Sequence, residues 1–228
     1  MNAKITVLLV DDHAIVRDGC RLLFQQADLE VVGEAVSGEV AYAQYLKRKP
    51  QVVVMDLTMP GIGGLEIIRR IRSRSQDAGI VVFTMHDDPI IATRALQAGA
   101  NCYVTKTSAP GDLVEAVKCA ASSKFYLSRD IAQSVALSNL GMHKSPLEAL
   151  TAREFEIFRL LADGKSCAEI ASAFSLTQKS VTNYSIRIKQ KLGARSLADL
   201  VRLAIDAGIV KQNVVSSTPH VTQAGDFG

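Results

Sequence analysis

Four apolar segments of the sequence end in, or are followed directly by, polar side chains that could do chemistry. These side chains are Asp11 and Asp12 after "ITVLLV", Asp56 after "VVVM", Thr84 at the end of "IVVFT" and Lys106 after "CYVT". An apolar run without polar alternation indicates a strand covered on both faces, as in a parallel sheet. Carboxylates, a hydroxyl and an ammonium group at one sheet edge are the groups that bind and transfer a phosphoryl group.

Taken alone, two of these residues have simpler explanations. Asp56 could start a turn or cap a helix, since Asp favours both, and Lys106 could form a structural ion pair. Three carboxylates at one sheet edge make these simpler explanations insufficient. Like charges this close repel one another unless some of the carboxyl groups stay protonated to higher pH or a cation binds between them. Oxygen ligands with partial hydration suit Mg²⁺. We therefore expect an aspartyl nucleophile beside a Mg²⁺ site, with Lys106 and Thr84 on the phosphoryl oxygens.

The first 122 residues alternate strand and helix patterns that would place these side chains. Strands are expected at 5–10, 30–35, 52–56, 80–84 and 102–105, and helices at 14–26, 38–48, 64–74, 88–98 and 111–122. Five strands alternating with helices predict an α/β fold with a doubly wound parallel sheet. Right-handed crossovers favour the flavodoxin-like strand order at this size.

The pattern changes after residue 122. Residues 123–149 mix Ser, Gly, Asn and Pro, and we interpret them as a linker with one short helix at 129–138. Residues 150–210 predict a small all-α domain of four helices, since hydroxyl residues in N-cap positions mark four helix starts: Thr151, Ser166, Thr177 and Ser196. Residues 211–228 are polar and aperiodic, so we expect a disordered tail.

The composition argues against a membrane-spanning protein, a secreted protein and a cysteine-based metal site. The chain is 48% hydrophobic and 21% charged, as in ordinary soluble proteins, and its apolar runs are too short to cross a bilayer. The N-terminal segment lacks the long apolar core of a signal peptide, so we expect a cytoplasmic location. The four cysteines show no metal-binding spacing and are interpreted as reduced thiols.

The net charge of +3 is unevenly distributed. Residues 1–125 carry 14 basic and 14 acidic side chains, whereas residues 150–210 carry nine basic and six acidic ones. The remaining segments are balanced. The excess therefore indicates a polyanionic partner for the C-terminal helices alone.

The spacing of these helices favours DNA as that partner. The second and third helices are separated by "FSLT", a turn of helix-turn-helix length. The third helix, from Gln178, presents side chains that can meet phosphates or base edges: Gln178, Lys179, Asn183, Arg187, Lys189 and Lys191. A solvated polar face would explain most basic helices. The helix-turn-helix spacing combined with localised positive charge favours a DNA-binding helix.

Residues 1–122 resemble the receiver domain of two-component response regulators, which has the CheY-like fold. The matching motifs are "DD" after the first strand, "MDLTMPGIGG" around the third, Thr after the fourth and Lys after the fifth. The resemblance implies that Asp56 accepts phosphate from a sensor histidine kinase. It further implies that Mg²⁺ is held by Asp12 directly, by Asp11 partly through water, by Asp56 and by the backbone carbonyl of Thr58.

The same resemblance implies a switch. Lys106 would pair with the phosphoryl group, Thr84 would swing its hydroxyl toward it, and Tyr103 would follow by turning inward. In this chain Cys102 stands where many relatives carry Gly, which tightens the start of the last strand.

The loop after the nucleophile also carries residues that the resemblance explains. Pro60 would fix this loop, because its ring restricts the backbone. Gly63 or Gly64 would allow its tight turn.

Residues 150–210 resemble the LuxR-type (NarL/FixJ-like) output domain, with "LTxRE", "EIA" and "KLG" in the same order. The family's "TVKxH" run reads "SVTNY" here, with Thr182 for Lys and Tyr184 for His. We expect Lys179, Asn183 and Arg187 to carry more of the binding. The full set of expected DNA-binding residues is Thr177, Lys179, Ser180, Asn183, Tyr184, Arg187 and Lys191.

These observations predict a DNA-binding transcriptional response regulator, not an enzyme, whose phosphorylation on Asp56 controls dimerisation and DNA binding. The final helix, 196–207, is the dimerisation element that the resemblance implies. Two alternatives stay open. The chain could regulate transcription without phosphorylation, or it could resemble the Mg²⁺-dependent phosphatases of the haloacid-dehalogenase type. Those phosphatases carry a second acid at the position where this chain has Thr58.

Overall fold

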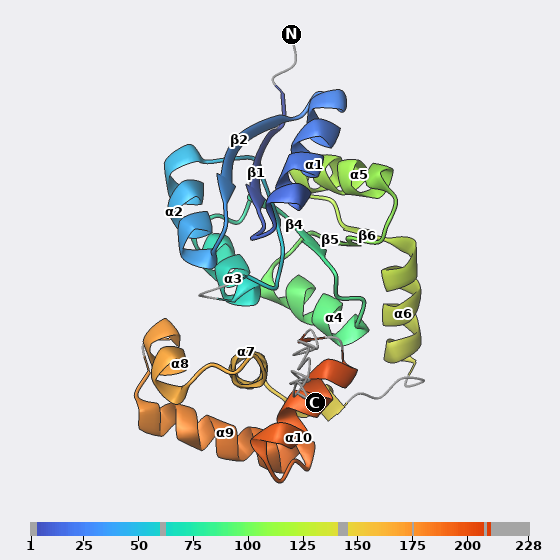
Figure 1. The fold of residues 1–228 in the computed structure, drawn as a ribbon. Helices are drawn as coiled ribbons and strands as arrows, with labels where there is room; N and C mark the ends of the chain where they lie inside the picture. The colour runs from blue at the N-terminus through green and yellow to red at the C-terminus, as the bar shows by residue number, and fades with distance from the viewer. Residues whose placement is uncertain (1–3, 60–62, 141–145, 175, 208, 211–228) are drawn as a thin grey trace, which may run out of the picture.

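The computed structural model describes residues 4–59, 63–140, 146–174, 176–207 and 209–210 (Figure 1). Pro60 and the predicted tail at 211–228 therefore lie outside the described residues. The N-terminal part is a parallel sheet with helices on both faces, and the C-terminal part is a group of helices beneath one end of that sheet. We call these two parts the sheet domain and the helical domain.

The sheet of the described residues has six strands in the order β2-β1-β3-β4-β5-β6. This order confirms the doubly wound arrangement and places the strands before Asp11 and Asp56 side by side. The strands are β1 (Thr6–Val10), β2 (Glu30–Ala35), β3 (Val52–Met55), β4 (Gly79–Thr84), β5 (Cys102–Thr105) and β6 (Tyr126–Leu127).

Helices cover both faces of the sheet, as its unbroken apolar strands require. Side chains on one face of β1, β3 and β4 pack with α1 and α5, and those on the other face pack with α2, α3 and α4. The bounds agree closely with the expected ranges: α1 (Ala14–Gln26), α2 (Gly38–Arg48), α3 (Gly64–Arg74), α4 (Pro89–Ala98) and α5 (Pro110–Ala121).

One strand was not predicted. β6 pairs with β5 in parallel, so the sheet extends into the segment that was interpreted as a linker. With two residues, β6 is too short to show a strand pattern. It is followed by α6 (Arg129–Asn139), one residue longer than the expected helix. The Ser128 amide donates to the Tyr103 carbonyl at 3.0 Å, which ties the start of α6 to the sheet.

The helical domain contains the four predicted helices, preceded by a 3₁₀ turn at Pro146–Ala149. Each predicted cap forms: the hydroxyls of Thr151, Ser166, Thr177 and Ser196 accept backbone N–H groups three residues on. These bonds satisfy amides that have no partner within the helix. The helices are α7 (Ala152–Ala162), α8 (Cys167–Phe174), α9 (Gln178–Leu192) and α10 (Leu197–Asp206).

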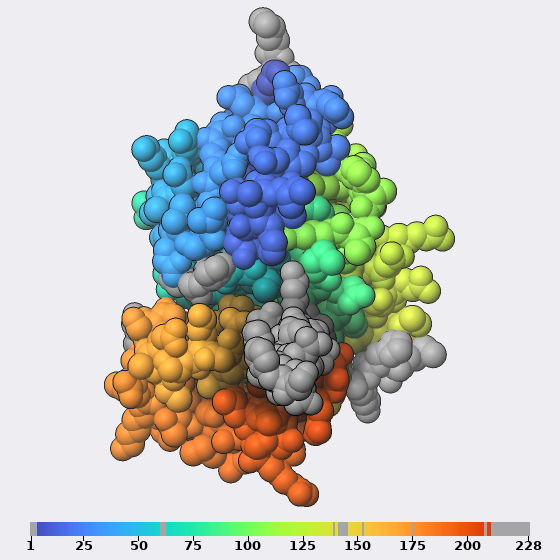
Figure 2. All heavy atoms as spheres, viewed as in Figure 1, coloured from blue at the N-terminus to red at the C-terminus, as the bar shows by residue number. Residues whose placement is uncertain are grey.

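The two domains share an interface. Figure 2 shows the orange atoms of the helical domain directly below the sheet domain. The buried apolar residues on the α3 and α4 side of the sheet continue without a break into those of α7 and α10. None of the helices in the described ranges is long and apolar enough to span a membrane.

Candidate phospho-acceptor site and nucleic-acid interface

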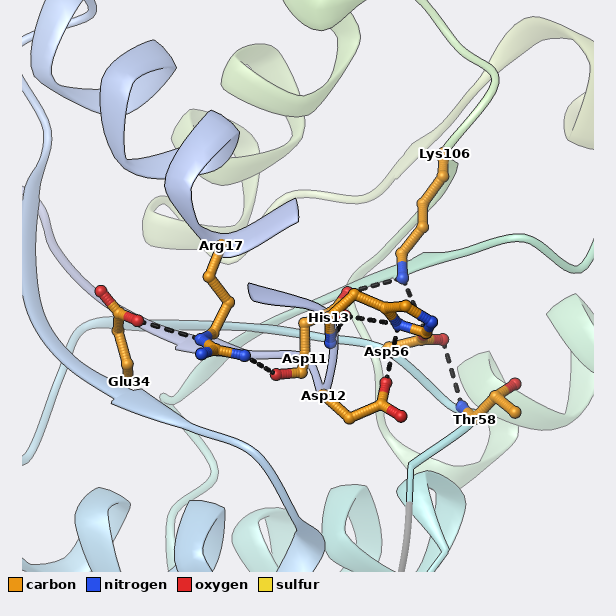
Figure 3. A network of polar contacts seen from close by, with 8 residues as sticks. All are labelled: Asp11, Asp12, His13, Arg17, Glu34, Asp56, Thr58 and Lys106. Atoms are coloured by element: carbon orange, nitrogen blue, oxygen red, sulfur yellow. Dashed lines mark hydrogen bonds and ion pairs between the residues drawn. The ribbon is translucent and has the colours of Figure 1, made fainter. Parts of the chain in front are cut away.

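The ends of three strands bring two aspartates and a lysine together (Figure 3). Backbone hydrogen bonds continue the sheet one residue past β3 and β5. The Asp56 amide donates to the Val10 carbonyl at 2.9 Å, and the Lys106 amide donates to the Thr84 carbonyl at 2.7 Å. Lys106 Nζ then lies 2.5 Å from Asp11 Oδ2 and 2.7 Å from Asp56 Oδ2. All three side chains are buried, so the ammonium faces the two carboxylates in a region with little water.

The pKa of Lys106 reflects the balance between burial and the two neighbouring carboxylates. Burial lowers the pKa of this ammonium group, but the charges and hydrogen bonds of Asp56 and Asp11 outweigh burial and raise it above the ordinary value. Lys106 is therefore a fixed cation at neutral pH. A fixed cation against a carboxylate nucleophile is suited to hold the oxygens of an incoming phosphoryl group.

Asp56 is held on both of its carboxylate oxygens. Lys106 binds Oδ2, and the backbone amide of Thr58 donates to Oδ1 at 3.1 Å. This pair of contacts fixes the orientation of the carboxylate, which is the requirement for a nucleophile that must meet its substrate in one direction. The receiver-domain resemblance implies metal binding by the Thr58 carbonyl, and the structure shows that the Thr58 amide also orients Asp56.

A third carboxylate and a histidine complete an acidic pocket, defined here as Asp11, Asp12, His13 and Asp56. One ligand atom from each residue lies within 4.8 Å of the others. His13 Nδ1 is 2.9 Å from Asp12 Oδ1 and 3.2 Å from Asp11 Oδ1. Three carboxylates, one of them exposed to water, fit a hard and partly hydrated divalent cation. His13 was not predicted, although its position directly after Asp11 and Asp12 is visible in the sequence.

The polar face of α9 carries the residues expected to bind DNA. Lys179, Asn183 and Arg187 are exposed and lie four residues apart, so they share one face of the helix. The other expected residues are more constrained. Thr177 and Ser180 are joined in the N-terminal cap, and Tyr184 is partly buried against the core.

Lys191 has a partner inside the helical domain. Its Nζ lies 2.6 Å from Oε2 of Glu154, the acid of the α7 capping box. Burial would raise the pKa of Glu154, but the Lys191 hydrogen bond and the capping bonds from Thr151 hold it below the usual value. The ammonium of Lys191 therefore joins α9 to α7 in this structure.

Comparison with known proteins explains why these two sites occur in one chain. The profile described as "Response regulator receiver domain" matches residues 7–118, and the one described as "Bacterial regulatory proteins, luxR family" matches residues 148–204. The response regulator UvrY of Escherichia coli K12 is 38% identical over 216 residues, which cover 93% of this chain and 99% of UvrY. The chain belongs to the LuxR family of two-component response regulators.

Two further members of this family are similar over most of their length. The response regulator GacA of Pseudomonas aeruginosa is 38% identical over 209 residues, covering 90% of this chain and 98% of GacA. The solved structure of RcsB from Salmonella enterica serovar Typhimurium, bound to a promoter in the presence of the phosphomimetic BeF₃⁻, matches with a TM-score of 0.73 and 26% identity. That match covers 88% of this chain and 98% of RcsB. The sheet domain is thus the receiver domain of a DNA-binding response regulator, and the helical domain is its LuxR-type output domain.

The predicted switch residues of the receiver domain meet at His86, which the sequence did not single out. The hydroxyl of Tyr103 donates to the His86 carbonyl at 3.0 Å, and the His86 amide lies 3.5 Å from the Thr84 hydroxyl. The His86 ring is 2.6 Å from the Thr58 hydroxyl. Tyr103 is turned inward and fully buried, so burial, followed by the charge of Asp56, raises its pKa well above the ordinary value.

An ion pair between Arg17 and Glu34 lies beside the acidic pocket (Figure 3). Arg17 Nη1 donates to the backbone carbonyl of Asp11 at 2.7 Å, and its Nε is 3.0 Å from Glu34 Oε2. These contacts fasten the loop after β1 to α1 and β2. Because Arg17 and Glu34 lie far apart in the sequence, no local pattern connects them.

The glycines of the loop after the nucleophile act through close packing. The sequence suggested that Gly63 or Gly64 permits a tight turn, but Gly63 has an ordinary φ of −59° and Gly64 lies in the first turn of α3. A Cβ on Gly64 would approach the Leu57 Cα to 2.8 Å, and one on Gly63 would collide with the carboxylate of Glu156 in α7. Gly64 is therefore restricted by the backbone of Leu57, whereas a side chain at Gly63 would displace the ends of Glu156 and Arg159 in α7.

Proposed function

We propose that Asp56 accepts a phosphoryl group from a sensor histidine kinase and that this modification controls DNA binding by the output domain. The observation that carries the proposal is the buried contact of Lys106 with both Asp56 and Asp11. In the transfer step, a bond forms between an Asp56 oxygen and phosphorus while the bond between phosphorus and the kinase imidazole breaks. Lys106 pairs with the transferred group, and the Thr84 hydroxyl turns toward it.

The acidic pocket is the proposed Mg²⁺ site. Asp12, Asp11, Asp56 and the Thr58 carbonyl would hold the ion, with Asp12 in most direct contact. When bound, the ion supplies positive charge opposite the phosphoryl oxygens. The clustering of the three carboxylates supports this assignment. His13 orients Asp11 and Asp12 through its ring nitrogen and its backbone amide, which donates to Asp11 Oδ1 at 2.8 Å.

Intact-protein mass after incubation with acetyl phosphate and MgCl₂ tests the phospho-acceptor. We expect one phosphoryl group on the wild type and none on Asp56→Asn, because the amide is not a nucleophile. Leaving out MgCl₂ should reduce the adduct on the wild type. No adduct on the wild type, with the donor shown to be active on another receiver protein, would favour the phosphorylation-independent regulator.

We further propose that α9 reads DNA through Lys179, Asn183 and Arg187, with Thr177, Ser180 and Tyr184 at its margins. Lys191 has a smaller part, since Glu154 already pairs with it. The exposure of the three main residues on one helix face supports this, as does the RcsB–promoter complex in a related protein. Paired output domains would bind paired half-sites, with α10 as the dimer element.

DNA affinity at a series of salt concentrations tests this interface. The DNA is a fragment selected by the wild-type protein from a random-sequence pool. Alanine at Lys179 and Arg187 should lower affinity and reduce the slope of log affinity against log salt by about 2, since each phosphate contact contributes about 0.9. Lys165→Ala, at an exposed lysine before α8, is the control and should leave the slope unchanged. An unchanged slope in the double variant would exclude α9 as the phosphate-binding face.

A further inference from the structure

One large apolar side chain stands on the polar face of α9. Ile186 is 47% exposed, and the core of the output domain is served by the opposite face of the helix, through the buried Val181 and Ile188. Ile186 is therefore not a core residue. The other exposed side chains of α9 are polar or charged: Gln178, Lys179, Thr182, Asn183, Arg187, Gln190 and Lys191.

Ile186 lies in the middle of the surface that we propose meets DNA. It follows Lys179 by seven residues, about two helical turns, and Asn183 by three, so these three side chains share one face of the helix. In Figure 1, α9 lies on the side of the output domain away from the sheet. Contact between the two domains thus leaves Ile186 accessible.

The folding of the free protein gives little reason for an isoleucine at this position. A side chain that stays half-exposed removes little apolar area from water. A β-branched residue also loses rotamer freedom in a helix, and its helix propensity is lower than that of Ala or Lys. Single exposed apolar residues are common on protein surfaces. What sets Ile186 apart is its place at the centre of a polar, proposed binding face.

The neighbours of Ile186 narrow what this face can recognise. The hydroxyl of Thr182 donates to the Gln178 carbonyl at 3.0 Å, so its donor is used within α9. The amide of Asn183 is the group that pairs with N6 and N7 of adenine. Between them, Ile186 presents only methyl and methylene groups to an incoming base edge.

The major groove of DNA carries one methyl group that matches such a side chain. Every base pair presents hydrogen-bond donors and acceptors there, but only thymine adds a methyl group, at C5. Contact of Ile186 with a phosphate or with a donor or acceptor would cover that polar group without giving it a partner. A thymine methyl group is therefore the partner whose contact with Ile186 is favourable.

We propose that Ile186 reads the methyl group of one thymine in each half-site, beside an adenine that Asn183 reads. The inference rests on the proposed DNA binding by α9 and adds the base preference of that helix face. The burial of one methyl group corresponds to about a fourfold gain in affinity. Ile186 is thus a specificity-determining residue, whereas Lys179 and Arg187 supply affinity through phosphates.

Deoxyuridine in place of thymine tests this contact, because it removes the methyl group and leaves the base-pairing groups unchanged. The DNA is a fragment selected by the wild-type protein from a random-sequence pool, and each thymine is replaced in turn. Fluorescence anisotropy at one salt concentration measures the affinity. For the wild type, we expect one thymine in each half-site whose replacement lowers affinity by about fourfold.

Variants of the full chain assign the effect to Ile186. Ile186→Ala should bind the thymine and deoxyuridine fragments equally. Leu46→Ala is the matched control, since Leu46 is an apolar residue of α2 in the receiver domain that is 43% exposed, and it should keep the wild-type preference for thymine. Far-ultraviolet circular dichroism checks that each variant is folded, and if Ile186→Ala is not, Ile186→Gln decides in its place.

The possible results separate this inference from the proposed function. Equal affinity of the wild type for all thymine and deoxyuridine fragments, or selected half-sites without thymine, would overturn the methyl contact and leave DNA binding in place. A thymine preference that Ile186→Ala retains would also overturn it, because another side chain would then read the methyl group. No DNA fragment bound by the wild type would overturn both proposals. A preference lost in Ile186→Ala but kept in Leu46→Ala supports the inference.

Discussion

At the scale of single residues, Lys106 balances the charges of the proposed phospho-acceptor site. Two buried carboxylates meet its ammonium, and Asp12 adds a third negative charge nearby. Removing one partner of a buried ion pair leaves the other charge without compensation, which costs about 3 to 5 kcal/mol. If Lys106 were removed, a divalent cation in the acidic pocket could supply the positive charge that the carboxylates then lack.

Lys106→Met tests this balance. In the absence of divalent cations, we expect the free energy of unfolding to fall by about 3 kcal/mol, because Asp11 and Asp56 lose their common cation. Added MgCl₂ should recover part of this loss, and it should stabilise the variant more than the wild type. The measurement is urea denaturation with and without MgCl₂. Equal stabilisation of the two proteins by MgCl₂ would show that Lys106 and the ion do not share the same carboxylates.

Tyr103 gives the receiver domain a dependence on alkaline pH. Burial raises the pKa of its phenol above the ordinary value, so the folded protein holds the proton more tightly than the unfolded chain does. The resulting stability is complete below the unfolded pKa of about 10 and is lost as the pH rises through the folded value. Tyr103→Phe should therefore lose less stability than the wild type between neutral pH and alkaline pH. Denaturation curves at a series of pH values measure this, and parallel losses would contradict the assignment.

At the scale of elements, the contact between α7 and the loop before α3 contains a buried acid. Glu156 is 1% exposed, and burial raises its pKa, although the charges of Arg159 and Arg69 oppose the change. Within the described part of the chain, its Oε2 has no hydrogen-bond partner, and its ion-pair partner is Arg159, whose Nε lies 3.7 Å away. A buried carboxylate with such weak partners destabilises the interface whenever it is ionised.

Glu156→Gln should stabilise the protein at neutral pH by about 1 to 3 kcal/mol, the penalty of a poorly paired buried group. For the wild type, the favourable contribution of a raised carboxyl pKa is present below the unfolded value of about 4.3 and is lost as the pH rises through the folded value. The difference between variant and wild type should therefore grow from acidic to neutral pH. Denaturation at both pH values measures it, and a constant difference would mean that Glu156 does not titrate.

The local elements were predictable because each has its own signal in the sequence. Asp11, Asp56 and Lys106 each follow an apolar run, and the sheet order that the crossover rule favours then brings them together. The caps at Thr151 and Ser196 follow from residue types three positions apart. β6 had no such signal, since two residues cannot show alternation.

The contacts between domains could not be predicted in the same way. Arg94 lies in an ordinary amphipathic helix pattern. Only the fold shows that its guanidinium donates to backbone carbonyls of the segment just before α7. Ile209 follows the last predicted helix, where no periodicity indicates burial. His86 looked like part of a loop, yet it joins Thr58 to Tyr103. Long-range packing decides the roles of these residues, and a single sequence does not contain that information locally.

At the scale of the whole molecule, the proposed phospho-acceptor Asp56 and the output domain lie at the same end of the sheet. The carboxyl ends of β1 and β3 present Asp11 and Asp56, and α7 and α10 lie against the same edge (Figure 1). A change at Asp56 can therefore reach the output domain through direct contacts, without a long pathway through the receiver.

The central claim is that phosphorylation of Asp56 increases DNA binding. The most direct test is fluorescence anisotropy on a labelled DNA fragment selected from a random-sequence pool, with and without acetyl phosphate and MgCl₂. We predict that the phosphodonor raises the affinity of the wild type by about tenfold, a coupling of about 1.4 kcal/mol, and leaves Asp56→Asn unchanged. An equal response of both proteins, or no response in a wild type shown by mass to be phosphorylated, would contradict the account.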